Sequence, residues 1–413
     1  MDTIACTAGS ELPGTPIDPA EYGPRTVATG PYYRRDWFEW EVEAIFRREW
    51  LQVAHVSEVQ NPGDFVVREV DCCKVSALIV KGKDGVIRAF HNVCTHRGTL
   101  LVSDRPAGNA PVFTCRYHGW SFERDGSLRA APDFDTFGLA KANCALKPIA
   151  LDVCGGLIYI NLDPQPRQSL AEFLGPAWDL LPYHAAATAT GFSEYVYEIE
   201  GNWKLVYDNF QETYHLRFIH PRSIGTSTSP AGNFFGYADT FATFGPHRTM
   251  LLPVNPEFEP APTAARGFGK VIQSAMERGT ELGPWNRYYF CMFPDNYLLL
   301  SQANPFVHSI MPISETRTRG TVRLYWNGED ASASERFARE FAMAATRDIH
   351  SEDVSVIEAC QKGILSRAID RVHFQQHELF CHYLYDQARL RVQDWLSQQG
   401  MADAADAALE FGR

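Results

Sequence analysis

The sequence predicts an α+β protein in which a small all-β domain is inserted into a larger domain, itself built on an antiparallel sheet flanked by helices. Three observations predict this class. Short β-type segments follow an opening stretch with helical periodicity, the composition changes after Pro164 and Pro166, and longer strands then give way to a helical C-terminal part. We expect the inserted domain to comprise residues 46–165 and the larger domain to comprise residues 1–45 plus 166–413.

The individual elements follow from the same patterns, taken in chain order. Apolar residues from Trp37 to Phe46 recur at helical spacing, and the C-terminal part from Ser332 to about Gln399 is helical throughout. Between these helical parts lie runs rich in β-branched and aromatic residues. The expected strands cover residues 64–70, 75–80, 86–93, 112–114 and 156–161 in the inserted domain and residues 194–199, 287–292 and 320–326 in the larger one.

Composition and charge exclude several classes of protein. With 413 residues, 45% of them hydrophobic, the chain can bury a substantial core, and a net charge of −12 argues against a nucleic-acid surface. No stretch approaches the roughly 18 apolar residues that a membrane span requires, and the opening residues lack the basic start and apolar run of a secretion signal. The ten cysteines show no disulfide framework, so we expect a cytoplasmic protein.

Two cysteine-histidine pairs lie within the expected inserted domain, Cys94-Thr-His96 and Cys115-Arg-Tyr-His118. Two thiolates and two imidazoles at this spacing indicate a [2Fe-2S] cluster in which one iron takes both thiolates and the other takes both imidazoles. Each pair then gives one ligand to each iron. A zinc site is the alternative, but zinc fingers usually place their cysteines together and their histidines together, whereas here each pair is mixed.

A second motif reads Gly-Asn-Trp-Lys-Leu-Val-Tyr-Asp-Asn-Phe-Gln-Glu-Thr-Tyr-His-Leu-Arg-Phe-Ile-His-Pro from Gly201 to Pro221. Together with the cysteine-histidine pairs, it resembles the catalytic α subunits of the Rieske non-heme iron oxygenases, along nearly the whole chain. The resemblance implies a Rieske [2Fe-2S] domain and a catalytic domain that binds mononuclear Fe(II) through two histidines and a carboxylate. The histidines would be His215 and His220.

A regular helix could not bring His215 and His220 to one metal, because five residues at about 100° each leave them about 140° apart. Glu212 and His215, three residues apart, would share a helix face. Pro221 biases His220 away from helical backbone angles. We therefore expect the helix to distort or end there and to return His220 toward the metal.

The family resemblance also points to the third iron ligand. In the family this carboxylate lies two helical turns before a Gln-x-Gly, and Asp353 has that position relative to Gln361-Lys-Gly363. Glu352 and Glu358 are the alternatives.

Glu212 and Asn209 are further candidate catalytic residues of the second motif. In the family, a carboxylate three residues before the first iron histidine hydrogen-bonds that histidine and a cluster histidine of the neighbouring subunit, which gives electrons a short route between the metals. Glu212 would bridge in this way to His118 or His96 of another subunit. Many members carry Asp at this position, and Glu is longer.

The resemblance implies a terminal oxygenase that uses O2 and externally supplied electrons to hydroxylate a small organic substrate. The sequence contains no Gly-x-Gly-x-x-Gly fingerprint for a nicotinamide or flavin, so the electrons would come from NAD(P)H through a separate reductase, directly or through a ferredoxin. The electron route between subunits implies a homotrimer, with or without β subunits.

The substrate class follows less directly from the sequence. With 26 Phe, 17 Tyr and 9 Trp, the chain could supply flat walls for an aromatic ring or an aromatic cage for a quaternary ammonium group. We expect an aromatic substrate that undergoes mono- or dioxygenation. The alternatives are N-demethylation or hydroxylation of a betaine, carnitine or choline type of compound, and a Rieske electron-transfer protein without oxygenase activity. The aromatic-rich residues 234–247 would line the substrate cavity or form ordinary sheet core.

Overall fold

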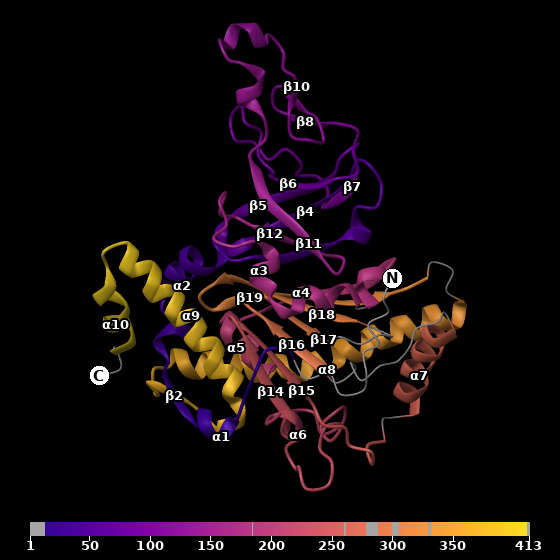
Figure 1. Cartoon of the computed structure of the whole chain (residues 1–413), viewed down its shortest axis with the longest axis vertical. Coiled ribbons are helices and arrows are strands. Elements are labelled where there is room, and N and C mark those ends of the chain that lie inside the picture. The colour runs from indigo at the N-terminus through magenta and orange to yellow at the C-terminus, as the bar shows by residue number, and fades with distance from the viewer. Residues whose placement is uncertain are drawn as a thin grey trace. The chain divides into compact units, whose positions relative to one another are not determined.

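The computed structural model describes residues 13–183, 185–259, 262–277, 288–299, 305–328 and 332–410. The chain divides into two compact units, a smaller one from Ile45 to Phe173 and a larger one made of the residues up to Ala44 and those from Leu174 onward (Figure 1). The opening residues, in which we found no secretion signal, lie outside the described residues. Within the described part of the chain, no helix combines the length and the apolar character needed to cross a membrane.

The smaller unit is built from antiparallel β-structure, as expected for the Rieske domain. Many of its strands are short runs of β-branched and aromatic residues, and β5 is buried along almost its whole length. The main sheet has the order β3 (Leu51–His55), β12 (Leu157–Asn161), β11 (Pro148–Cys154), β6 (Ile87–His91), β5 (Val75–Lys81), β4 (Asp64–Val70) and β7 (Ala107–Asn109). The second sheet has the order β10 (Leu128–Ala130), β9 (Ser121–Phe122) and β8 (Phe113–Thr114).

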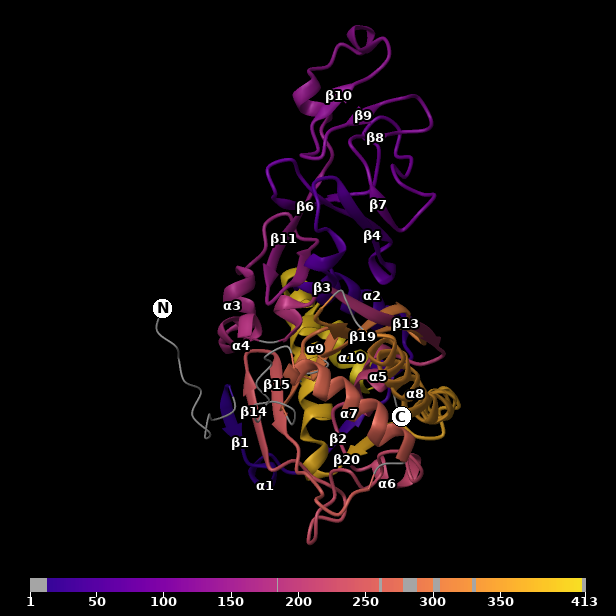
Figure 2. The same ribbon diagram turned by 90° about the vertical axis from the view of Figure 1, so that its right-hand side faces the viewer.

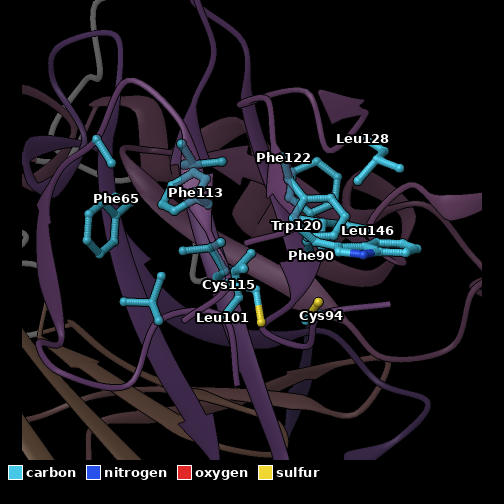
Figure 3. Packing of buried hydrophobic residues seen from close by; sticks show 14 of the residues in the cluster. Phe65, Phe90, Cys94, Leu101, Phe113, Cys115, Trp120, Phe122, Leu128 and Leu146 are labelled. Atoms are coloured by element: carbon cyan, nitrogen blue, oxygen red, sulfur yellow. The ribbon is translucent and has the colours of Figure 1, made fainter. Parts of the chain in front are cut away.

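A hydrophobic core fills the smaller unit beneath the loops that are expected to hold the [2Fe-2S] cluster. Phe90, Phe122 and Trp120 pack in it with Cys94 and Cys115, and both cysteines are buried. Figure 3 shows the two sulfur atoms close to one another at one edge of this packing. Both thiols are therefore held by the domain core.

The larger unit contains an antiparallel sheet of its own, confirming the expected α+β class. Its order is β1 (Thr15–Ile17), β14 (Thr240–Phe244), β15 (His247–Leu251), β16 (Tyr288–Met292), β17 (Asn296–Leu299), β18 (Phe306–Ser314), β19 (Arg317–Trp326) and β13 (Gly191–Ile199). The long helix α8 (Ala333–Leu365) extends along the sheet and contacts β13 (Figure 1), and α7 (Pro262–Glu277) lies beside α8 (Figure 2). The other longer helices are α2 (Arg35–Glu41), α5 (Trp203–Asn209), α9 (Leu379–Gln398) and α10 (Ala402–Glu410).

The C-terminal part is less uniformly helical than the sequence predicts. After α8 the chain turns at Arg367, whose φ is +58°, and forms β20 (Arg371–Phe374), which pairs with β2 (Arg25–Ala28) before α9 begins. The prediction of continuous helix from Ser332 was therefore wrong at β20. Its aromatic side chain Phe374 packs in a buried cluster with Val27, and this long-range packing overrides local helical preference.

A buried polar network ties residues 31–41 to α5. The Lys204 ammonium donates to Glu41 at 2.6 Å and to the carbonyl of Pro31 at 2.9 Å, and the indoles of Trp37 and Trp203 donate to the same carboxylate at 2.9 and 2.8 Å. Both charged groups are at most 1% exposed, so their burial depends on this full set of partners. The network fixes α5, the helix that forms the first part of the second motif.

Candidate metal centres

Two loops of the smaller unit share one backbone pattern around a cysteine and a glycine. The N–H of Cys94 and the N–H of Cys115 each donate to the carbonyl five residues further on, at 2.8 and 2.7 Å. The N–H of Gly98 and the N–H of Gly119 each donate back to the cysteine carbonyl at 3.0 Å. Both glycines have φ above +70°, a region in which other residues are strained. The two loops therefore present their cysteines in the same way.

The four expected cluster ligands meet at the tips of these loops. The rings of His96 and His118 lie 4.7 Å apart between centroids, and Trp120 stacks on His96 at 4.9 Å. Burial raises the pKa of the Cys94 thiol, and the neighbouring Cys115 raises it further, so a thiolate here needs a cation beside it. Burial also lowers the pKa of His96, which favours the neutral imidazole that binds metal. The donor set fits a Rieske cluster, because the two thiols are buried in the domain while the two imidazoles lie nearer its surface.

The second donor set lies at the two ends of a single helical turn. Helix α6 (Leu216–Ile219) begins after His215 and ends before His220, and the two imidazole centroids are 5.3 Å apart. The expected helix end at His220 is observed. Glu212, however, precedes α6 and follows the end of α5 at Asn209, so the expected helix carrying both Glu212 and His215 is broken.

Asp353 comes to the same point from α8. Its Oδ1 lies 2.9 Å from Nε2 of His220 and 3.7 Å from Nε2 of His215, and the three potential ligand atoms lie within 4.8 Å of one another. The carboxylate is only 2% exposed, and its Oδ1 has no hydrogen-bond partner of acceptable geometry among the described residues. Two imidazole nitrogens and one carboxylate oxygen converging in this way are the donor set of a non-heme Fe(II) site.

Two further carboxylates hold the two histidines from the side opposite Asp353. Glu212 accepts from Nδ1 of His215 and, at 3.2 Å, from its backbone N–H; Glu352 lies 2.7 Å from Nδ1 of His220. With Nδ1 bonded outward, Nε2 of each ring faces Asp353. Burial opposes protonation of His220, but Asp353 and Glu352 outweigh it and raise the pKa of the imidazole, so a cation at this point would replace a proton.

Glu352 is therefore not the third ligand, although the sequence left it open as one. Adjacent helix positions point about 100° apart, so Glu352 passes beside Asp353 and reaches the far nitrogen of His220. Ser223 donates a hydrogen bond to the same carboxylate oxygen at 2.6 Å. Glu358, the other alternative, accepts from the backbone N–H of Glu200 at 3.2 Å. In the sequence, the sign that Glu352 supports His220 was its position next to Asp353 on the same helix.

Gln361 anchors α8 so that Asp353 lies beside His215 and His220. Its side-chain oxygen accepts from the backbone N–H of Asn202 at 2.7 Å, and its amide nitrogen donates to the carbonyl of Tyr32 at 3.2 Å. Asn202 is the residue that caps α5, so the bond fixes α8 against the start of the second motif. Asp353 lies eight residues, about two turns, before this anchor.

A cavity of about 270 Å³ adjoins the three converging ligands. Asn209 lines it, and its amide nitrogen is buried without a hydrogen-bond partner among the described residues. Residues 234–247 do not occur in the described lining. Of the two roles left open for them by the sequence, Phe241 and Phe244 have the second, as buried sheet core. Rings and aliphatic side chains make up most of the wall: Phe210, Leu216, Ile224, Met250, Leu252, Phe268, Tyr289, Tyr297, Leu299, Phe306, Leu324, Ile349 and His350.

Comparison with known families agrees with this geometry. Residues 186–394 match the model of the ring-hydroxylating α subunit catalytic domain, and residues 49–146 match that of the Rieske [2Fe-2S] domain. The chain belongs to the Rieske non-heme iron oxygenases, as a ring-hydroxylating α subunit. Membership in this family of oxidoreductases makes the chain an oxygenase, with a Rieske cluster in one domain and a mononuclear iron site at His215, His220 and Asp353 in the other.

Individual members of the family resemble the chain over different lengths. The carnitine monooxygenase oxygenase subunit of Acinetobacter baumannii is 28% identical over 344 residues, which are 80% of this chain and 82% of the relative. The large oxygenase component of the naphthalene 1,2-dioxygenase system of Pseudomonas putida is 36% identical over 209 residues, 49% of this chain and 46% of the relative.

Solved structures of the family have the same fold. The quaternary ammonium Rieske monooxygenase CntA, in complex with the inhibitor MMV12, aligns with a TM-score of 0.72 at 25% identity, covering 90% of this chain and 97% of that one. Naphthalene 1,2-dioxygenase from Rhodococcus sp., bound to indole, aligns with a TM-score of 0.71 at 20% identity, covering 89% and 95%. The second likeness bears on the fold alone.

Proposed function

We propose that this Rieske oxygenase hydroxylates or N-demethylates a small quaternary ammonium compound. The proposal reverses the order of the two substrate classes expected from the sequence. Similarity to carnitine monooxygenase subunits extends over four fifths of the chain, whereas similarity to naphthalene dioxygenase covers about half of it.

The observation that carries the proposal is a closed circuit of four rings in the cavity wall. Centroid distances are 4.9 Å from Phe210 to His350, 5.9 Å from His350 to Phe306, 6.1 Å from Phe306 to Tyr297 and 6.4 Å from Tyr297 to Phe210. Burial lowers the pKa of His350 to about 4, so its ring is neutral at pH 7. Where the faces of such rings line a cavity, they attract a methylated ammonium group.

The charges around the cavity support the same class. The described lining contains Glu212 and Asp353 but no lysine or arginine. A cationic substrate therefore meets no repelling group there, while a substrate carboxylate would find no cationic partner among these residues. Compounds of the choline type fit these walls better than compounds with a carboxylate.

When bound, the cluster supplies electrons one at a time and the mononuclear iron provides the place at which O2 is reduced. Glu212 would connect the two. It holds the Nδ1 proton of His215, and in a homotrimer, with or without β subunits, the same carboxylate would meet His118 or His96 of a neighbouring subunit. Electrons would come from NAD(P)H through a separate reductase, directly or through a ferredoxin. Asn209, which lines the cavity, would be a further catalytic residue.

A neutral aromatic compound is the second candidate, because the same walls are apolar and offer flat faces to a ring. The test is O2 consumption by the anaerobically purified, iron-replete protein with a reductase, using choline, L-carnitine and indane in parallel. Oxidised nitrogen-containing products with choline or carnitine, and none with indane, would support the proposal. Oxidised indane alone would establish the aromatic class instead.

A further inference from the structure

Two members of the ring circuit can also donate a hydrogen bond, the Tyr297 hydroxyl and the His350 imidazole, and the contacts of His350 define its donor. It lies on α8 three residues before Asp353, so the two side chains share a face and are separated by about 4.5 Å along the helix axis. Both residues line the cavity. A group bound at His350 would therefore lie about one helical turn from the iron ligand.

Tyr195 fixes the orientation of the His350 ring. The Tyr195 hydroxyl from β13 hydrogen-bonds Nδ1 of His350. Burial raises the pKa of Tyr195 above its ordinary value, so this hydroxyl keeps its proton. It has no other hydrogen-bond partner among the described residues, and donation to Nδ1 therefore satisfies it.

The tautomer of His350 follows from this bond. A neutral imidazole that accepts at Nδ1 carries its hydrogen on Nε2. No described residue hydrogen-bonds Nε2 of His350, and the side chain faces the cavity. The cavity wall therefore includes a ring N–H without a hydrogen-bond partner among the described residues.

Resting on the proposed function, we infer that His350 donates a hydrogen bond from Nε2 to an uncharged oxygen of the substrate, and that Tyr195 positions it to do so. The substrate would carry a hydroxyl or carbonyl oxygen beside its methylammonium group. The ring circuit holds the cationic end, and His350 holds the oxygen and selects which carbon faces the iron.

The test measures binding by titration calorimetry of the full-length, iron-replete protein with two pairs of probes. Choline and ethyltrimethylammonium differ by one hydroxyl, as do 1-indanol and indane. The wild-type protein should bind choline roughly 2- to 10-fold more tightly than its deoxy partner, the range expected for one net hydrogen bond. His350→Phe keeps an aromatic wall and should abolish this preference.

Two tyrosine variants separate positioning from packing. Tyr195→Phe removes the hydroxyl that orients His350 and should reduce the preference for choline. Tyr197→Phe removes a hydroxyl two residues along the same strand, which bonds buried His308 at 2.7 Å, and should keep it. Iron content and the visible spectrum of each variant report whether both metal sites are intact, and if His350→Phe is not folded, Tyr195→Phe carries the test.

The inference is overturned if the wild-type protein does not prefer the hydroxylated member of either pair, or if the preference survives in both His350→Phe and Tyr195→Phe. A preference within the indanol pair alone, lost in His350→Phe, would retain the hydrogen bond and reject the ammonium class. A preference for choline without its oxidation would likewise retain the hydrogen bond and reject the proposed reaction.

Discussion

The two metal centres of this chain are built in opposite ways. The four cluster ligands come from two loops of six residues each, Cys94–Thr99 and Cys115–Trp120, whose own backbone hydrogen bonds set their shape. The mononuclear ligands come from both ends of α6 and from α8, and Asp353 is more than 130 residues away from His220 in the sequence.

This difference determines what supports each site. In the cluster loops, a left-handed glycine and two backbone hydrogen bonds per loop suffice, and the domain core below them is apolar. The mononuclear site depends on buried polar contacts, since Gln361 anchors α8, Lys204 with Glu41 anchors α5, and Glu212 and Glu352 orient the imidazoles. Changes far from the iron should therefore disturb the second site more than the first.

The largest effect is expected from His118→Ala, which removes one cluster ligand. We expect loss of both cluster irons, of the sulfide and of all activity, because neither loop can supply a replacement donor. Absorption spectra and acid-labile sulfide content measure this. Tyr117→Phe is the matched control, since its exposed ring packs against His118 at 3.7 Å without supplying a ligand, and it should keep the colour.

Asp353→Ala should separate the two centres. Iron is expected to fall from about three to about two per chain, with activity lost and the cluster spectrum unchanged, because the third mononuclear ligand is gone. Metal analysis beside the visible spectrum checks this. A variant that keeps all its iron would place the ligand elsewhere.

Glu212→Gln tests the connection between the centres. Both metals should remain, while turnover falls roughly 10- to 100-fold, because an amide holds the Nδ1 proton of His215 less firmly than a carboxylate does. Single-turnover measurements on the pre-reduced protein would locate the loss in electron delivery. Wild-type turnover would exclude the bridge, and Glu212→Asp, which keeps the charge on a shorter side chain, is the matched comparison.

Glu352→Gln should weaken the mononuclear site alone. We expect iron affinity to fall roughly 10-fold, since Nδ1 of His220 loses its carboxylate, while the cluster is unaffected. Iron titration of the metal-depleted protein measures the change. Ser223→Ala, which removes only a donor to the same carboxylate, should cost less; equal losses would contradict this order.

The smallest effect concerns pH and the stability of the larger unit. Burial raises the pKa of Asp208 to about 8, with Gln211 and Lys204 acting in the opposite direction. The carboxyl therefore contributes stability that is fully present below its ordinary pKa, near 3.8, and is lost as pH rises to about 8. Between pH 5.5 and 8.5, Asp208→Asn should gain at least about 1 kcal/mol in unfolding free energy relative to wild type. Urea unfolding of both proteins at the two pH values measures this. The same difference in unfolding free energy at both pH values would contradict the prediction.

Much of the protein was determined by local sequence. Runs rich in β-branched and aromatic residues identified strands such as β4 and β12, and the spacing of Cys94, His96, Cys115 and His118 was sufficient for the cluster, because each loop closes on its own hydrogen bonds. Pro221 likewise indicated that the helix before it would end at His220.

Tertiary structure decided the rest, because those features depend on which distant segments pack together. The pairing of β20 with β2 overrode a helical pattern, and the break between Asn209 and Leu216 is visible only once α5 and α6 are placed. Helix α8 turns Asp353 toward the histidines and Glu352 behind one of them, a distinction that neighbouring carboxylates in a sequence do not reveal. The same helix faces His350 into the cavity, where Tyr195 from another element decides which nitrogen carries its proton.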